Sequence, residues 1–307
     1  MRRGDRWARM SAVAVLGTGR MGSAMARALA RDGHALTLYN RHRERADALA
    51  AELGTGRVVE SPAEASRGQD VVLSMVADDR AVDALFRDSG GVLEGLGAGT
   101  VAVDASTVRP AVIRSLEAPV RSLGAGLLDA PVSGSVALAE AGELTLMVGG
   151  EAADLERARP VLESLGTRVI HVGPLGAGAT VKLAVNALIL GINGALSEAL
   201  VLAERAGVER SVAYEVFATG AAAAPYVLYK RAAFERPEAT PVAFSLDLAA
   251  KDLGLILDLA REAGVEMPQS QTNLRLIEAA AGSAGADRDL SSVAGYLRGQ
   301  ASGWSDG

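Results

Sequence analysis

The chain has 307 residues, and at roughly 150 residues per domain this length favours two domains with substantial cores. Its 31 Lys and Arg and 37 Asp and Glu leave a formal net charge of −6, so bulk charge does not favour nucleic acid or an anionic membrane as a partner. The absence of cysteine excludes disulfides, thiolate nucleophiles, Cys-ligated zinc and iron–sulfur clusters, and the three scattered histidines predict no metal site. The default compartment is the cytoplasm.

Apolar residues make up 49% of the chain, yet no membrane span is predicted. A spanning helix needs about 20 predominantly apolar residues with few or no charges. The longest apolar stretch, residues 183–203, is interrupted by Asn186, Asn193, Ser197 and Glu198. Because residues 179–206 are apolar nearly all round, we expect a helix that is buried on most sides, between two domains or two subunits.

From Ala12 to about His171, short β-branched runs alternate with helical patterns, which predicts βαβ units and a parallel sheet. After about Gly178 the strand patterns end and long helical patterns continue as far as Leu297. This change predicts a domain boundary. The predicted strands are Val13–Leu16, Ala35–Tyr39, Val71–Met75, Val101–Val103, Gly126–Asp129, Leu144–Val148 and Arg168–Val172.

These patterns divide the chain into five segments. Residues 1–10 are basic but contain Asp5, and they lead into a strand rather than a signal core, so we predict a disordered leader with Met10 as an alternative start. The remaining segments are an α/β domain at 11–173, a loop and long helix at 174–206, an all-α domain at 207–300 and a tail at 301–307.

The first predicted strand runs directly into a glycine-rich segment, Gly17-Thr18-Gly19-Arg20-Met21-Gly22. A G-x-G-x-x-G segment between a strand and a helix is typical of a dinucleotide-binding turn, so these six residues are predicted to bind the cofactor. Gly17 permits the tight turn, Gly19 lets a pyrophosphate approach the backbone, and Gly22 lets the helix pack on the strand. The alternative is a glycine-rich turn that binds no ligand.

The residues after the second predicted strand bear on the choice of cofactor. Where an NAD-specific fold usually carries an acid, this chain reads Asn40-Arg41. A carboxylate there would repel a 2′-phosphate, whereas neutral and cationic donors favour it, so the pair predicts NADP(H) in preference to NAD(H). The alternative is that Arg41 and Arg43 are solvated charges at a helix entry.

Lysine is rare in this chain and occurs only at Lys182, Lys230 and Lys251. Arginine stays protonated in proteins, whereas a lysine ammonium can donate a proton and its pKa falls on burial. Lys182 lies four residues before Asn186 in an apolar helical pattern, so the two side chains share one helix face. We expect the loop at 173–179 to deliver Lys182 to the first turn of this helix. The alternative is a lysine that snorkels from a helix end.

A second candidate binding turn follows the predicted strand that ends at Asp129. The segment reads Asp129-Ala130-Pro131-Val132-Ser133-Gly134-Ser135 and lies at the carboxyl edge of the sheet, where open α/β folds bind ligands. The backbone N–H groups of Gly134 and Ser135 and the hydroxyl of Ser133 are donors suited to a small carboxylate. The alternative is an ordinary turn.

Together these segments resemble the β-hydroxyacid dehydrogenase family, which includes 3-hydroxyisobutyrate dehydrogenases and glyoxylate/succinic semialdehyde reductases. The resemblance covers Ala12 to about Pro268. It implies an α/β Rossmann-like, NADP-binding N-terminal domain and an all-α C-terminal domain joined by a long interdomain helix, a homodimer or homotetramer, and an active site at the interdomain cleft. Four motifs carry it: Gly17 to Gly22, Asp129 to Gly134 with Gly142 and Gly149-Gly150, Gly176 to Asn186, and Lys251-Asp252-Leu253.

The resemblance also implies roles for single residues. Lys182 would be the catalytic general acid/base and Asn186 its catalytic companion. The implied substrate-binding residues are Ser133, Gly134, Ser135, Phe244 and Asp252. Further predicted cofactor contacts are Val76, Ser106, Thr107 and Lys251. Ser135 stands where the family commonly has glycine, and Val185 stands where the phosphogluconate-dehydrogenase branch has histidine, which disfavours decarboxylation of a large sugar phosphate.

The sequence therefore predicts an NADP(H)-dependent oxidoreductase that transfers hydride between nicotinamide and a small carboxylate-bearing hydroxyacid or its aldehyde or keto form. Three alternatives stay open. They are an NAD-preferring 3-hydroxyisobutyrate-type dehydrogenase, an imine reductase-like activity, and a non-catalytic dinucleotide-binding protein. The identity of the substrate and the preferred direction are not predicted.

Overall fold

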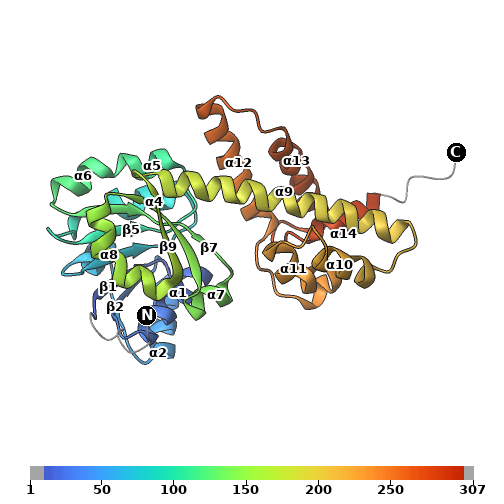
Figure 1. Cartoon of the computed structure of the whole chain (residues 1–307). Helices are drawn as coiled ribbons and strands as arrows, with labels where there is room; N and C mark the ends of the chain where they lie inside the picture. Colours follow the sequence, from blue (N-terminus) through green and yellow to red (C-terminus); the bar gives the residue numbers. More distant parts are fainter. Residues whose placement is uncertain (1–9, 301–307) are drawn as a thin grey trace. The chain divides into compact units, whose positions relative to one another are not determined.

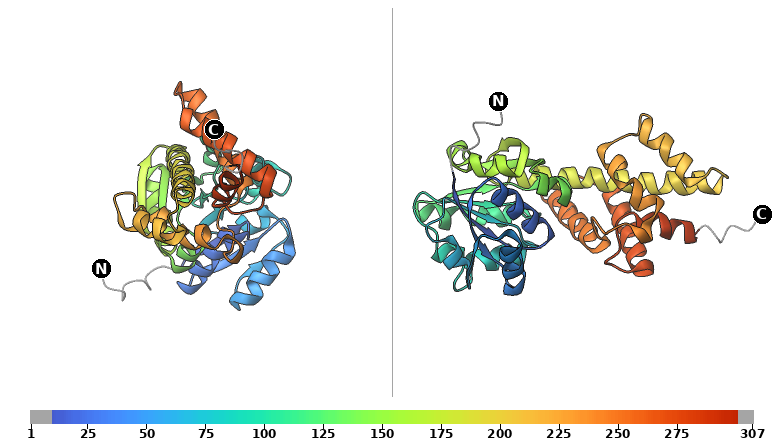
Figure 2. Two further views of the ribbon diagram at one scale, coloured as in Figure 1. Left: turned by 90° about the vertical axis from the view of Figure 1, so that its right-hand side faces the viewer. Right: turned by 90° about the horizontal axis from the view of Figure 1, so that it is seen from below.

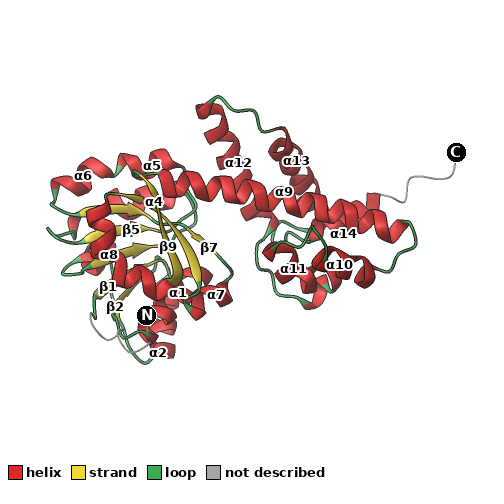
Figure 3. Ribbon diagram, in the orientation of Figure 1, coloured by secondary structure: helices red, strands yellow, loops and turns green. Residues whose placement is uncertain are grey.

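The computed structural model describes residues 10–300, and its helices and strands are drawn in Figures 1 and 3 and from two further sides in Figure 2. The chain separates into two units, and the division falls after Lys182. Apart from Met10, the predicted leader at 1–10 and the predicted tail at 301–307 lie outside the described residues.

The first unit is built on one sheet with the strand order β3-β2-β1-β4-β5-β6-β8-β7 and with β9 beside β8. The strands are β1 (Ala12–Leu16), β2 (Ala35–Tyr39), β3 (Arg57–Val58), β4 (Val71–Ser74), β5 (Val101–Asp104), β6 (Gly126–Asp129), β7 (Val132–Ser133), β8 (Leu144–Gly150) and β9 (Gly166–Gly173). All seven predicted strands are confirmed, each to within two residues at either end. Strands β3 and β7 have only two residues each, which is too short for a recognisable pattern.

Strands β1 to β6 pair in parallel in the order 3-2-1-4-5-6, which is the order of a Rossmann fold. The prediction of a parallel sheet is wrong for β8, which is antiparallel to β6 and β7 and parallel to β9. A parallel crossover needs about a dozen or more residues, and the link from β7 to β8 holds only the short helix α7 (Val136–Ala141).

Helices cover both faces of the sheet (Figure 1). Along β1, Val13 and Val15 belong to one apolar cluster, and Ala14 and Leu16 belong to the other. Both faces of the strand are therefore buried, which explains its continuous apolar sequence. The flanking helices are α1 (Arg20–Arg31), α2 (Arg43–Leu53), α3 (Pro62–Ser66), α4 (Asp79–Arg87), η2 (Val92–Glu94), α5 (Pro110–Ser115), α6 (Glu117–Ser122), α7 and α8 (Ala152–Leu165).

The long helix α9 (Ala177–Arg205) begins earlier than the sequence predicted. Because the helix starts at Ala177, Lys182 lies in its second turn and not in its first. The division between the two units falls inside this helix, so the predicted boundaries at 174 and 206 stay a prediction.

We expected α9 to be buried on most sides, yet Leu188 is 66% exposed and Leu202 is 71% exposed. This chain alone therefore leaves part of the apolar surface of α9 uncovered. Among the described residues, α9 is long and apolar enough to cross a membrane, with 44% of its most apolar window buried. This is weak evidence for a span, because the core helix of a soluble protein has the same length and composition.

The second unit is helical, as predicted. It continues α9 with α10 (Arg210–Thr219), α11 (Pro225–Glu235), η3 (Pro237–Ala239), α12 (Leu246–Ala263), α13 (Pro268–Ala284) and α14 (Ser292–Gln300). Its core contains a buried ion pair in which Lys230 Nζ lies 2.7 and 2.8 Å from the two carboxylate oxygens of Asp289. Asp289 also accepts hydrogen bonds from the backbone N–H groups of Ala243 and Ser291, so it ties α11 to the chain on either side of α12 and α13.

Candidate functional site

The glycine-rich turn between β1 and α1 is tightly packed at two of its three glycines. Gly17 has a φ of +99°, and a Cβ there would lie 2.3 Å from the carbonyl oxygen of Met75. A Cβ on Gly22 would lie 1.9 Å from the carbonyl oxygen of Gly17. Only glycine fits these two positions, in agreement with the turn and packing roles that the sequence predicted.

The third glycine borders open space that suits a phosphate. A Cβ added to Gly19 would meet no atom within 4 Å, and no side chain caps the start of α1. The first N–H groups of a helix are ready donors for an anion. In addition, the Thr18 hydroxyl is buried in this turn with no hydrogen-bond partner, which is unusual for a buried polar atom. These features fit the diphosphate of a dinucleotide.

Asn40 ties the glycine turn to the end of β2. Its side-chain oxygen accepts a hydrogen bond from the N–H of Thr18 at 3.0 Å, and its amide nitrogen donates to the carbonyl of His42 at 2.9 Å. Arg43 opens α2 and pairs with Asp47 at 3.2 Å. Arg41 is exposed.

Two further predicted cofactor residues, Val76 and Ser106, are hydrogen-bonded to each other, and Ser106 also binds a buried acid, Asp104, that the sequence analysis did not single out. Ser106 accepts a hydrogen bond from the N–H of Val76 at 3.0 Å and donates its hydroxyl to Asp104 at 3.1 Å. The hydroxyl of Ser74 also donates to Asp104, at 2.5 Å. This network links the ends of β4 and β5, and Thr107 follows Ser106 in the same loop. The sequence does contain a signal that could have identified Asp104, because β5 and β6 are both buried strands that end in Asp.

Burial raises the pKa of Asp104 to about 6 from its ordinary 3.8, although hydrogen bonds from Ser74 and Ser106 oppose the shift. The folded chain thus holds this proton more tightly than the unfolded chain. The resulting stabilisation is complete below about pH 4 and is lost as the pH rises towards and through about 6, with a size of about 3 kcal/mol.

We expect Asp104→Asn to remove this pH dependence. The neutral amide can donate to both hydroxyls while its oxygen accepts from the N–H of Ser106, so the hydrogen bonds are preserved. Urea unfolding between about pH 4 and 8 checks this: the free energy of unfolding of the variant, relative to wild type, should increase with pH by up to about 3 kcal/mol. A difference that stays constant with pH would contradict the raised pKa.

The turn at 133–135 joins β7 to α7. Gly134 has a φ of +146°, and a Cβ there would lie 2.6 Å from Leu144 Cδ2. The Ser135 hydroxyl caps α7, since it accepts a hydrogen bond from the N–H of Leu138 at 3.3 Å. The side chain that replaces the family's glycine therefore has a structural use as a helix cap.

In the second unit, the structure brings together three of the predicted site residues. The buried Asn186 donates its side-chain amide to Asp252 at 2.7 Å, and Lys251 Nζ lies 3.0 Å from the other oxygen of Asp252. Asp252 was predicted to border the substrate, and in this structure it orients Asn186. Phe244 is half-buried just before α12 and packs on the core of this unit. Lys182 is half-buried.

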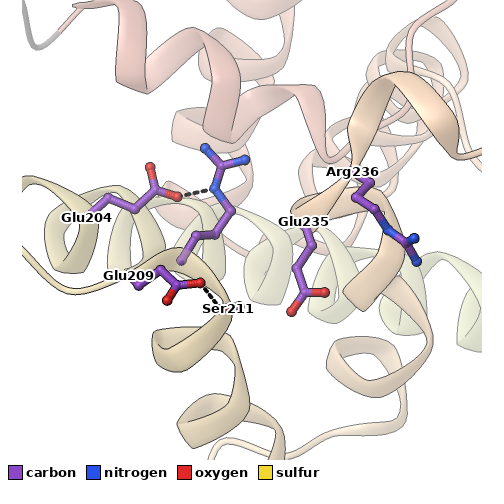
Figure 4. Close-up of a pocket in the computed structure, with 6 residues that line it drawn as sticks. Glu204, Glu209, Ser211, Glu235 and Arg236 are labelled. Atoms are coloured by element: carbon purple, nitrogen blue, oxygen red, sulfur yellow. Dashed lines mark hydrogen bonds and ion pairs between the residues drawn. The ribbon is translucent and has the colours of Figure 1, made fainter.

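The second unit also carries a shallow surface cavity of about 530 Å³ that is open to solvent (Figure 4). It is lined by Glu204, Glu209, Arg210, Ser211, Glu235 and Arg236. Arg210 pairs with Glu204, and the Ser211 hydroxyl donates to Glu209, so these groups satisfy one another. None of the predicted site residues lines this cavity. Within residues 10–300, no group of three or more His, Asp or Glu side chains is arranged to hold a metal ion.

Comparison with known proteins identifies the family. The family model described as the NAD binding domain of 6-phosphogluconate dehydrogenase matches residues 12–173, and the one described as NAD-binding of NADP-dependent 3-hydroxyisobutyrate dehydrogenase matches residues 176–297. The chain belongs to the β-hydroxyacid dehydrogenase family. As a member of this family, it binds a nicotinamide dinucleotide and is an NAD(P)-dependent dehydrogenase or reductase of hydroxyacids.

Individual β-hydroxyacid dehydrogenases are similar over almost the whole chain. The NAD-dependent L-serine dehydrogenase of Pseudomonas aeruginosa is 33% identical, over 92% of this chain and 97% of its own length. The 3-sulfolactaldehyde reductase of Escherichia coli is 31% identical, over 94% and 96%. The structure of Mycobacterium tuberculosis 3-hydroxyisobutyrate dehydrogenase with L-serine is 31% identical, with a TM-score of 0.83 over 94% of this chain and all of that one.

Proposed function

We propose that this dehydrogenase uses NADP(H) to interconvert a small hydroxyacid and its aldehyde or keto form, with Lys182 as general acid/base. The observation that carries the proposal is the placement of Lys182 four residues before the buried Asn186 on α9. The substrates named for the relatives, L-serine, 3-sulfolactaldehyde and 3-hydroxyisobutyrate, are small acids or aldehydes.

When bound, the nicotinamide ring supplies the hydride chemistry. In reduction, the Lys182 ammonium donates a hydrogen bond and then its proton to the carbonyl oxygen of the substrate, where negative charge develops. In oxidation, the neutral amine accepts the hydroxyl proton. Asn186 is fixed by Asp252 and helps to orient the reacting oxygen. Ser133 and Gly134 hold the substrate carboxylate through their hydroxyl and N–H groups.

A substrate panel tests the activity. Purified protein with NADPH should reduce small carbonyl acids such as glyoxylate and succinic semialdehyde, and with NADP⁺ it should oxidise 3-hydroxyisobutyrate or L-serine, followed by nicotinamide absorbance. A parallel panel of imines tests the imine reductase alternative. Tight NADPH binding without turnover on either panel would support the non-catalytic alternative.

The cofactor preference rests on Arg41. Because both polar atoms of the Asn40 side chain are used within the turn, we propose that the exposed Arg41 is the main donor to the 2′-phosphate. Arg41→Ala should raise the Kd for NADPH about tenfold, as expected for the loss of one charge-assisted hydrogen bond at an exposed site, and leave the Kd for NADH unchanged.

Arg43→Ala is the matched control for this prediction. It removes the same charge two residues away, from a side chain that already pairs with Asp47. Calorimetric titration with both cofactors compares the two variants. An NADPH-to-NADH ratio that changes equally in both would show that general charge, and not a contact from Arg41, sets the preference.

We further propose a homodimer or homotetramer and a cytoplasmic location. The exposed apolar side chains of α9 and α10 support self-association, since Leu188, Leu202, Val212 and Val216 are each more than half exposed in the single chain. Sedimentation velocity of the full chain measures the subunit number.

A further inference from the structure

The buried carboxylate of Asp129 lies at the start of α9. This side chain ends β6 and is 1% exposed. Its Oδ1 accepts a hydrogen bond from the N–H of Gly176 at 2.8 Å, and its Oδ2 accepts one from the N–H of Ala179 at 2.7 Å. Both oxygens therefore bind N–H groups at the start of α9, and these donors follow Asp129 in the chain by 47 and 50 residues.

The segment before α9 provides no cap of its own. Residues 173–176 read Gly-Pro-Leu-Gly and offer no Ser, Thr, Asp or Asn to accept the first N–H groups of the helix. The carboxylate of Asp129 supplies this acceptor from a neighbouring strand, and its negative charge favours the positive end of the helix dipole. The start of α9 is therefore positioned by β6.

Two glycines are needed to let the helix approach this carboxylate. A Cβ on Gly149, in β8, would lie 2.3 Å from Asp129 Oδ1. A Cβ on Gly178 would lie 2.9 Å from Asp129 Oδ2 and 2.3 Å from the carbonyl oxygen of Met147. Two of the four sequence motifs, the one that holds Asp129 and Gly149 and the one from Gly176 to Asn186, therefore meet at one carboxylate.

Lys182 follows Gly178 by four residues, so both lie on one face of α9. The hydrogen bonds that Asp129 accepts from Gly176 and Ala179 fix the start of α9. They therefore set both the rotation of this face about the helix axis and its position along that axis. We propose that Asp129 is the positioning residue for Lys182, a proposal that rests on the function proposed for that lysine. Asp129 does not take part in proton transfer, because both of its oxygens accept backbone hydrogen bonds.

The test is a double-mutant cycle between Asp129→Asn and Lys182→Ala in the full-length protein. In the wild-type background, Asp129→Asn should lower kcat about 10²-fold, because a displaced catalytic group costs about this much, while the Kd for NADPH stays within about twofold. In the Lys182→Ala background it should change kcat by less than about threefold, because a residue that acts through Lys182 has nothing left to position. If the fold losses in kcat of the two single variants simply multiply in the double variant, the proposal is overturned.

Hydrogen exchange supplies a readout that does not depend on turnover. The amides of residues 176–182 should exchange faster in Asp129→Asn, while those of β1 and α1 keep their protection. If Lys182→Ala retains full activity, the proposed role of the lysine fails, and Asp129 as its positioning residue fails with it. Faster exchange would then still identify Asp129 as the cap of α9. A failure of the function proposed for Lys182 is thus distinguished from a failure of the capping by Asp129. Unchanged exchange overturns the capping itself.

Asp154→Asn is the matched control. Asp154 is also buried in the first unit, where it pairs with Arg121 at 2.6 Å and with Arg157 at 3.0 Å, and it makes none of the contacts to α9 described above. This variant should unfold at a lower temperature with kcat unchanged. Should Asp129→Asn fail to fold, Asp129→Ser keeps one cap oxygen in a smaller side chain and takes its place in the cycle. A loss of kcat in Asp154→Asn equal to that in the Asp129 variant would overturn the proposal.

Discussion

Lys182→Ala should lower kcat by about 10²- to 10⁴-fold, which is the usual contribution of a general acid or base. The Kd for NADPH should stay near its wild-type value, because the predicted phosphate contacts lie in the turn at 17–22 and at Arg41. The measurement is steady-state turnover on the best substrate of the panel, with NADPH titration and the unfolding temperature as companions. Equal losses in kcat and kcat/KM would indicate that the interaction is made only in the transition state.

Lys182→Arg is the control for charge. It keeps a cation at the same helical position, but guanidinium does not give up a proton in proteins, so it should not restore turnover. Full activity of the alanine variant would remove Lys182 from the mechanism. Full activity of the arginine variant alone would show that a fixed positive charge is sufficient and that no proton is transferred.

Gly19→Ala and Gly22→Ala should separate ligand binding from packing in the same turn. A methyl group at Gly19 would meet no protein atom within 4 Å, but it would occupy the open space where we expect a phosphate of the cofactor to bind. We expect the Kd for NADPH to rise by about 100-fold while the unfolding temperature of the cofactor-free protein changes little. Isothermal titration and thermal unfolding measure the two effects.

At Gly22 the added methyl would lie 1.9 Å from the carbonyl oxygen of Gly17, so the helix must move away from the strand. Overpacking of this kind typically costs about 1–3 kcal/mol, and here the obstacle is backbone, so the unfolding temperature should fall together with cofactor affinity. Wild-type NADPH affinity in Gly19→Ala would show that the phosphates do not bind at this turn.

The strands could be predicted because their signals are local. A buried parallel strand such as β4, Val71–Ser74, needs an uninterrupted apolar run, and each such run is visible in the sequence. The antiparallel direction of β8 could not be predicted in this way, since it depends on how a short link folds back and not on the residues of β8 itself.

The candidate site shows the same division. The spacing of Gly17, Gly19 and Gly22 predicts a dinucleotide turn because the three glycines act within six residues of chain. The use of Ser135 as a helix cap was not predicted, although its partner, Leu138, is only three residues away. Serine is a suitable residue both for capping a helix and for donating to a ligand, so the residue type does not separate the two roles.

The sequence by itself determined the fold class, the family, the glycine turn and the rarity of lysine, since all of these depend on residue types at short spacings. Only the tertiary structure decided how the polar side chains are used. Asn40 reaches back 22 residues to Thr18, Asp104 joins Ser74 across 30, and Asp129 holds α9 across 47 and 50. The physical reason is that a buried polar atom forms its hydrogen bonds with whichever groups the folded chain places beside it. Partners so far apart in the chain produce no repeating pattern in the sequence from which the contact could be predicted.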